Sequence, residues 1–390
     1  MKCPHCLAEL KYRERRDKKC PQCQKQFALE PRENMLKMSD LRLHGLADRL
    51  SHRGTYRYTP AQLAYFVFRR ELQSIFKTEF SWSEPSAVVA TIIFGIVFLV
   101  TLACTLSLIL RDRSLFSAVV ALGIGALIGS IAVGLYYRAM KSSHPYRRLL
   151  PVIESFETTY VIPWVSVHGP LPGRVTDQEI AALRRAQLHP SQVRAVLASP
   201  VADVLDCLRA NGLPDCLGLA LLSTDGPFSA ADERILALLR QNPRLPLLLI
   251  HDASVAGCLL PVLLPGKWGL SPNHRVIDLG LRPRHVKPQR LPWTLEQAPQ
   301  VLINLLERRV RMPGGLTLEN EELEWLRQGF VTSALFIPPA RLVNVVTKAV
   351  ERLTSAPVAA GRGALARTVD PEAQAQAEAR AIGFMTWPQR

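Results

Sequence analysis

Two long, uninterrupted runs of apolar residues dominate the hydropathy pattern of this chain. The first, SAVVATIIFGIVFLVTLACTLSLIL, covers residues 86–110, and the second, LFSAVVALGIGALIGSIAVGLYY, covers residues 115–137. Neither run contains a charged residue, and each is longer than the roughly 20 residues that a helix needs to cross a bilayer. Only RDRS separates them. The pattern therefore predicts an antiparallel transmembrane hairpin over residues 86–137.

The flanks of this hairpin predict its orientation. Basic residues are more frequent before the first run and directly after the second than in the short loop between them. By the positive-inside rule, both termini are expected in the cytoplasm. The chain is therefore predicted to be an integral protein of a bacterial inner membrane, in contact with membrane lipid. Gly125 and Gly129 form a small-xxx-small pair in the second run. Such a pair is consistent with packing inside the hairpin or with a homo-oligomer.

Short apolar runs alternate with helical patterns farther along the chain. The runs at 216–224, 245–252 and 274–281 are typical of strands buried on both faces, and helices are predicted between them. Just upstream, PSQVRAVLAS and VADVLDCLRANG are each interpreted as short helices. The alternation predicts a C-terminal α/β domain over residues 138–355, with a mostly parallel sheet. Residues 356–390 lack a core pattern and are interpreted as a mobile tail.

Helix starts are indicated at three places outside this alternation. A helix is predicted over residues 39–50, inside a helical connector at 28–85. Capping-box pairs, Thr59 with Gln62 and Thr176 with Glu179, predict two further helix starts.

Polar residues follow the predicted strands, where open α/β sheets bind ligands. They are Asp225, His251, Asp252, Ser254 and Asp278. LLLIHDASVAG resembles the strand and turn of Toprim domains, in which an Asp-x-Asp pair binds magnesium. Here Asp252 is followed by Ser254, so the resemblance implies at most a degenerate form around residues 216–280. The alternative is that Asp252 or Ser254 caps the next helix, while His251 packs at the sheet edge.

The formal net charge of +15 suggests an anionic partner or a cytoplasmic membrane face. Eight cysteines are too few for a disulfide scaffold in 390 residues. Cys104, Cys207, Cys216 and Cys258 are scattered in apolar settings and are interpreted as buried thiols of a reducing compartment. The other four cysteines belong to the first residues of the chain.

The N-terminal segment MKCPHCLAELKYRERRDKKCPQCQKQF contains two C-x2-C pairs, Cys3 with Cys6 and Cys20 with Cys23. Two such pairs supply the four thiolates of a tetrahedral zinc site. Residues 1–27 resemble the zinc-ribbon family, and the site is expected to be structural, since four thiolates leave no position for water. His5 is interpreted as a solvent-facing residue. The basic stretch between the pairs has only Tyr12 for base stacking, so nucleic acid is the least favoured partner.

These features favour a membrane-anchored cytoplasmic adaptor or scaffold, with a structural zinc ribbon and an α/β domain that binds a protein partner. The layout resembles uncharacterised bacterial membrane proteins with N-terminal zinc ribbons. Two alternatives remain: an enzyme or ligand sensor with its site at the strand ends, and a ribbon that binds nucleic acid at the membrane. The chain contains no G-x-S-x-G, P-loop or G-x-G-x-x-G motif.

Overall fold

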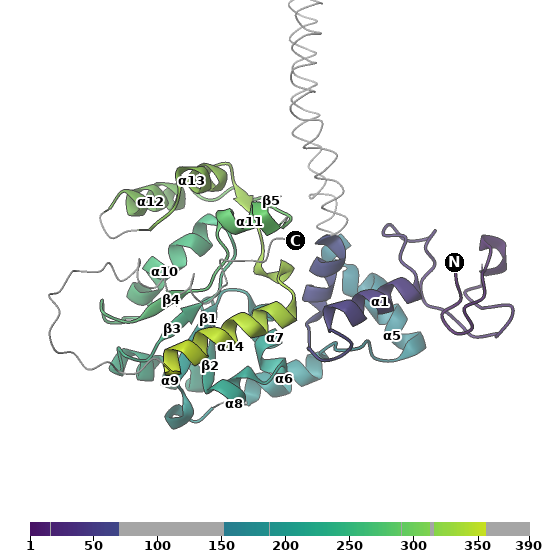
Figure 1. Ribbon diagram of the computed structural model, residues 1–390, viewed down its shortest axis with the longest axis horizontal. Coiled ribbons are helices and arrows are strands. Elements are labelled where there is room, and N and C mark those ends of the chain that lie inside the picture. Colours follow the sequence, from purple (N-terminus) through teal and green to yellow (C-terminus); the bar gives the residue numbers. More distant parts are fainter. Residues whose placement is uncertain (16, 70–151, 187, 290, 313–315, 356–390) are drawn as a thin grey trace, which may run out of the picture. The chain divides into compact units, whose positions relative to one another are not determined.

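The computed structural model describes residues 1–15, 17–69, 152–186, 188–289, 291–312 and 316–355. By its contacts the chain divides into one unit of Met1–Arg69 with Ile153–Arg390 and a second unit of Arg70–Val152. The fold described below is that of the first unit, which is discontinuous in sequence (Figure 1).

The described α-helices are α1 (Asp40–Leu50), α5 (Ile162–His168), α6 (Asp177–Arg185), α7 (Ala202–Ala210), α8 (Leu213–Leu217), α9 (Ala230–Gln241), α10 (Val255–Lys267), α11 (Pro283–Gln289), α12 (Gln300–Arg311), α13 (Asn320–Arg327) and α14 (Pro339–Ser355). Shorter turns of helix are η1 (Tyr12–Arg15), η2 (Glu157–Val161), η3 (Pro190–Gln192) and η4 (Ala334–Phe336). The strands are β1 (Ala195–Ser199), β2 (Leu219–Ser223), β3 (Leu247–Leu249), β4 (Val276–Asp278), β5 (Thr294–Leu295) and β6 (Phe330–Val331). Residues 60–69 are also helical.

A four-stranded parallel sheet, in the order β2-β1-β3-β4, forms the centre of the α/β domain. Three of its strands lie within the predicted runs and are shorter than them. The fourth, β1, was missed, because PSQVRAVLAS was predicted to be a helix. All five residues of β1 are buried, and a run this short has no periodicity that separates a strand from a buried helix. A separate antiparallel pair joins β5 to β6.

Helices cover both faces of the sheet, as the continuous burial of its strands predicts (Figure 1). On one face, side chains of α9 and α10 pack on alternate residues of the strands, with the buried Trp268 at the end of α10. On the other face, α7 contacts β1 and β2, and α14 contacts α7 and α8. A second, smaller core joins α10 to α12 and α13.

The predicted helix starts are confirmed. Ser39 accepts a hydrogen bond from the Arg42 amide at the start of α1. Thr176 and Glu179 form a complete capping box on α6. The Thr59 and Gln62 side chains exchange hydrogen bonds with each other's backbone amides, over 3.1 and 3.3 Å. In each case the side chain pairs with an amide that has no partner inside the first helical turn.

The predicted transmembrane part of the fold class is corrected. Among residues 1–69 and 152–355, apart from the short gaps given above, no helix is long and apolar enough to span a bilayer. The apolar α10 has 13 residues, so it reaches only about 20 Å of a hydrocarbon layer about 30 Å thick. The 17-residue α14 carries several charges. The structure shows a four-cysteine cluster and an α/β domain with a parallel sheet.

The predicted location in a bacterial inner membrane depended on the same hairpin and is withdrawn with it, since no spanning helix is found among the described residues. The runs at 86–110 and 115–137, with Gly125, Gly129 and Cys104, lie outside the described residues, as does the predicted tail at 356–390.

Candidate metal centre and the strand ends

The four N-terminal cysteines converge at one point. Their sulfur atoms all lie within 4.8 Å of one another, and two of the distances, Cys3 Sγ to Cys23 Sγ and Cys6 Sγ to Cys20 Sγ, are 3.7 Å. A tetrahedral zinc ion with Zn–S bonds of about 2.3 Å requires sulfur–sulfur distances of about 3.8 Å. The arrangement therefore has the dimensions of a four-thiolate metal site.

Two matching turns build this site. In the first, the Leu7 amide donates to the Cys3 carbonyl and the Cys3 amide donates to the Ala8 carbonyl. The second repeats both bonds, from Gln24 to Cys20 and from Cys20 to Lys25. Leu7 and Gln24 hold the same left-handed backbone conformation, with φ of 60° and 59°. The repetition explains how two similar CPxC sequences present two thiols each to a common point.

Backbone amides favour the thiolate form within the cluster. The amides of Cys23 and Gln22 lower the pKa of Cys20 to about 7 against the effect of burial. For Cys6, the Ala8 amide lowers the pKa, but burial and the other three thiols outweigh it and raise the pKa to about 11. Thiols packed this closely cannot all ionise without a cation. A divalent cation removes that conflict.

His5 is not part of the cluster, as the sequence predicted. Its Nε2 atom lies 2.9 Å from the Gln26 carbonyl, so the ring ties the first turn to the second. The ring also lies 5.2 Å from that of His168, measured between centroids. His168 in turn contacts Asp40 over 2.5 Å between Nε2 and Oδ2.

Asp40 holds the residues that directly follow the cysteine segment against the start of α1. It is buried in the first turn of α1, and its two carboxylate oxygens accept the amides of Ala28 and Leu29, both at 2.8 Å. Ala28 directly follows Phe27, which closes the small core beneath the cysteines. Through Asp40, the residues that follow the cysteines are thus linked to α1 and α5.

The predicted strand-end residues do not form one site. His251 and Asp278 do meet: His251 Nε2 lies 3.0 Å from Asp278 Oδ1, and the other ring nitrogen lies 2.8 Å from the Asp252 carbonyl. Asp278 also accepts from the Gly280 amide at 2.8 Å and from the Arg282 guanidinium at 2.8 and 3.2 Å. This network is closed to solvent, with His251 fully buried and Asp278 4% exposed.

Charge pairing dominates the electrostatics of this buried network. Burial alone would raise the pKa of Asp278, but His251 and Arg282 outweigh it and hold that pKa far below its usual range. The Arg282 amide donates to Nδ1 of His285. Burial lowers the pKa of His285 to about 4, so this ring is neutral at pH 7. The groups therefore form a structural ion-pair network at the end of β4.

The other three predicted residues have separate structural roles. Ser254 caps α10 by accepting the Gly257 amide at 2.9 Å. Asp252 accepts the Ala334 amide at 2.6 Å and so orders η4. Asp225 is exposed and lies 3.5 Å from Lys267 Nζ. For these two residues the structure has the predicted alternative: Ser254 caps the following helix, and His251 is buried and hydrogen-bonded.

The chain itself fills the crevice between β1 and β3, where an open sheet of this order would hold a ligand. The short helix η4 contacts α7, which follows β1, and is hydrogen-bonded to Asp252, which follows β3. The three residues of η4 are buried. An isolated bridge between Ala253 and Thr332 fastens the same segment. Of the predicted strand-end residues, Asp252 is the one that this segment covers.

The scattered cysteines are only partly as predicted. Cys207 and Cys258 are buried, and burial raises the pKa of each to about 12, which keeps both thiols protonated and unreactive. Cys216 is exposed, contrary to the prediction. It lies in the short helix α8, ahead of the strand to which the sequence pattern assigned it.

Sequence reasoning missed the arginines that complete the buried networks. Arg282 comes four residues after Asp278 and is 2% exposed. Asp206, also buried, pairs with both Arg184 and Arg209. A buried carboxylate needs a cation beside it, and the spacing of Asp278 and Arg282 was a usable signal. Nothing in the sequence connects Arg184 to Asp206, because they lie on different helices.

No model of a known protein family matches this chain, and comparison with curated protein sequences gives no match either.

Proposed function

We propose that this protein is a non-enzymatic adaptor whose N-terminal cysteine segment is held by a structural zinc ion and whose surface binds a protein partner. The observation that carries the proposal is that most polar side chains at the strand ends already have partners within the protein. Four of these side chains, those of His251, Asp252, Ser254 and Asp278, are engaged in internal hydrogen bonds. The short helix η4 contacts α7 and is hydrogen-bonded to Asp252, so it occupies the space between the ends of β1 and β3. A catalytic site needs groups free to reach a substrate, and these are not free.

Zinc is the metal that the donor set favours. Four cysteine sulfurs at tetrahedral spacing are typical of structural zinc sites. The zinc-ribbon resemblance of residues 1–27 points the same way. Such an ion would hold the two turns together, and all four of its positions would be filled by Cys3, Cys6, Cys20 and Cys23.

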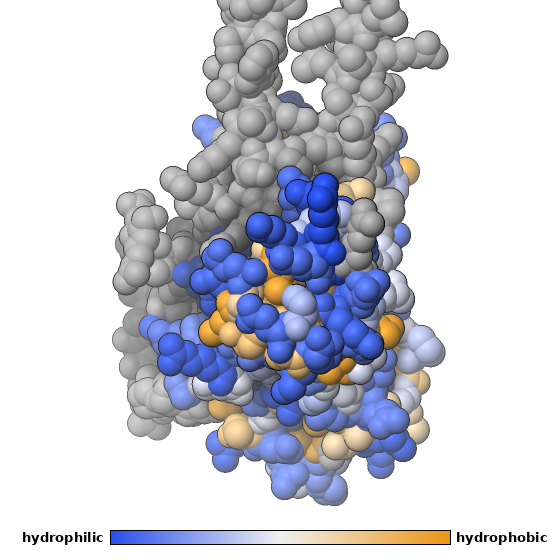
Figure 2. All heavy atoms as spheres, turned by 90° about the vertical axis from the view of Figure 1, so that its right-hand side faces the viewer, coloured by the Kyte–Doolittle hydropathy of each residue, from blue (hydrophilic) through white to orange (hydrophobic). Residues whose placement is uncertain are grey.

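The surface near the cysteines suits a protein partner better than nucleic acid. Figure 2 shows a mostly hydrophilic face with hydrophobic groups set into it. Leu7, on the first cysteine turn, is 62% exposed, and exposed apolar side chains in a polar rim are typical of protein contacts. Tyr12 is covered by the guanidinium of Arg32, 4.7 Å from the ring centroid. The tyrosine is therefore not free to stack on a base.

Metal analysis of the purified full-length protein tests the zinc assignment. One zinc ion per chain is expected for the wild type. Cys20→Ser should lose it, whereas Cys216→Ser should retain it, because Cys216 is an exposed cysteine outside the cluster. A folded wild-type protein without a bound divalent metal would refute the assignment.

Crosslinking in the source cells, followed by binding of the purified candidate to the purified protein, tests the adaptor role. A partner is expected to bind the wild type and to bind Leu7→Ser at least tenfold more weakly. Val301→Ser is the matched control, since Val301 is 76% exposed on α12. If no crosslinked protein binds again in purified form, or if a substrate is turned over, the adaptor role is wrong.

A further inference from the structure

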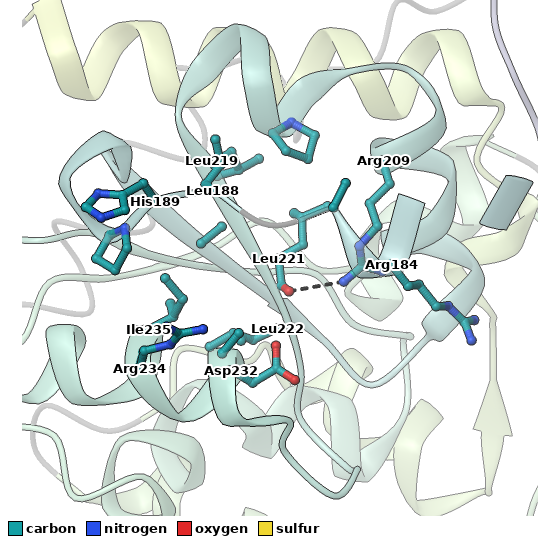
Figure 3. Close-up of a pocket in the computed structure, with 15 residues that line it drawn as sticks. Arg184, Leu188, His189, Arg209, Leu219, Leu221, Leu222, Asp232, Arg234 and Ile235 are labelled. Atoms are coloured by element: carbon teal, nitrogen blue, oxygen red, sulfur yellow. Dashed lines mark hydrogen bonds between the residues drawn. The ribbon is translucent and has the colours of Figure 1, made fainter. Parts of the chain in front are cut away.

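A pocket of about 250 Å³ lies beside β2, the strand at one edge of the four-stranded sheet (Figure 3). Its walls come from β2, α8 and α9, and from Ala186, Leu188, His189 and Pro190. Much of this lining is apolar: Leu188, Pro190, Pro214, Leu221 and Ile235. The pocket is thus a small concave site whose walls are partly apolar and partly polar, a combination that suits a small molecule with both kinds of group. None of the predicted strand-end residues lines it.

Arg209 supplies one positive group at the floor of this pocket. Its guanidinium donates to the Leu221 carbonyl over 3.1 Å and to Asp206 over 3.0 Å. Arg184 binds the same carboxylate through two hydrogen bonds. In Figure 3 the Arg184 guanidinium points away from the pocket, whereas that of Arg209 turns toward Leu221. A single buried carboxylate is therefore shared between two cations.

Arg234 supplies a second positive group, from α9. Among the residues that the structure describes, its guanidinium has no hydrogen-bond or ion-pair partner, although its side chain lines the pocket. The neighbouring Asp232 does not neutralise it by contact. The carboxylate of Asp232 accepts the amide and hydroxyl of Ser229, at 2.9 and 2.7 Å, as the cap of α9.

We propose that this pocket binds a small organic monoanion, a carboxylate on a short hydrocarbon body. Of the charged side chains that line the pocket, Arg184 and Arg209 are already paired with Asp206, whereas Arg234 is available to a ligand. The apolar walls take the hydrocarbon body, and the carboxylate pairs with Arg234 in the field of Arg209. A guanidinium binds a carboxylate through two parallel N–H donors, which gives the site its orientation.

Calorimetry and ligand-detected NMR on the purified full-length protein test this site. The probes are butanoate, hexanoate, octanoate and benzoate, with hexan-1-ol as the uncharged match of hexanoate. Arg234→Glu removes the proposed anchor from an exposed position, and Ala231→Trp fills the pocket from the first turn of α9. Arg308→Glu on α12 is the matched charge reversal at an exposed arginine far from the pocket in sequence.

At least one of the four carboxylates should bind with one site per chain, and hexan-1-ol should bind at least tenfold more weakly than hexanoate. Arg234→Glu and Ala231→Trp should each weaken binding at least tenfold, and Arg308→Glu should leave it unchanged. No binding by any carboxylate would overturn the proposal, as would equal binding of acid and alcohol or undiminished binding by Arg234→Glu. The pocket shares no residue with the cysteine cluster, so the adaptor role can fail or stand separately.

Discussion

Replacing Asp278 with asparagine tests the buried ion-pair network at the end of β4. The substitution keeps the shape of the side chain and removes its charge. Arg282, 2% exposed, then loses the carboxylate that receives two of its hydrogen bonds, at 2.8 and 3.2 Å. Breaking a buried pair on one side costs about 3–5 kcal/mol. Because the amide oxygen can still accept the Gly280 amide, we expect a loss near the lower value, about 3 kcal/mol.

Thermal unfolding of the full-length protein at pH 7 measures this loss. In a domain of roughly 200 residues, 1 kcal/mol corresponds to about 2–4 °C in Tm, so Asp278→Asn should unfold roughly 6–12 °C below the wild type. Hydrogen exchange of the amides in 276–286 should accelerate in parallel. The matched control is Asp225→Asn, which removes an exposed carboxylate paired with Lys267 at 3.5 Å and should shift Tm by no more than about 1–2 °C.

The pH dependence separates a charge effect from a packing defect. The pKa of Asp278 lies below its usual range, so its stabilising effect is complete above the unfolded-state pKa of about 3.9 and is lost as the pH falls toward the folded-state pKa. The gap between wild type and Asp278→Asn should therefore narrow below about pH 4. A variant that unfolds at the same temperature as Asp225→Asn, or a gap that widens in acid, would refute the reasoning.

Three further predictions concern the same region. A Cβ on Gly280 would lie 2.2 Å from the fully buried ring of His251, so Gly280→Ala should lower the free energy of urea unfolding by about 1–3 kcal/mol. A Cβ on Gly266 would meet nothing within 4 Å, so the control Gly266→Ala should not lower it, and equal unfolding free energies for the two variants would contradict the packing around His251. Burial lowers the pKa of His285 to about 4, so the free energy of unfolding should fall by about 3 kcal/mol as the pH drops from roughly 6.5 to 4. His285→Gln should flatten this dependence of the unfolding free energy on pH, and an unchanged dependence would exclude His285 as its source. Ser254→Ala removes the cap of α10 and should lower the free energy of unfolding by about 1 kcal/mol. Urea unfolding would show this loss as a lower midpoint, and an unaltered midpoint would disprove it.

Local signals in the sequence predicted the parts of the structure that depend on near neighbours. The two CPxC pairs place four thiols together because each turn closes within a few residues, and the capping residues Ser39 and Thr176 act within one helical turn. The parallel sheet followed from its apolar strands. These features depend on residues that are close together in the sequence.

The remaining features depend on partners that are distant in sequence. The strand β1 is central only because β2 and β3 pair with it on either side, and its own five residues fit a helix equally well. The crevice beside His251 is filled by η4, about eighty residues later. Arg184 and Asp206 meet across two helices. No spacing rule predicts such meetings, so the sequence suggested a ligand site where the chain packs on itself.

The contacts of Asp40 and Arg57 with residues far along the chain delay the completion of the fold during synthesis. Asp40 and His168 are 128 residues apart, and Arg57 and Asn211 are 154 apart. At about 5–20 residues per second, the ribosome delivers His168 roughly 6–26 seconds after Asp40. The cysteine turns can close around a metal during that interval, but Asp40 and His44 of α1 still lack their partners His168 and Trp164 on α5. The nascent chain can therefore complete the cysteine turns before α1 can pack on α5.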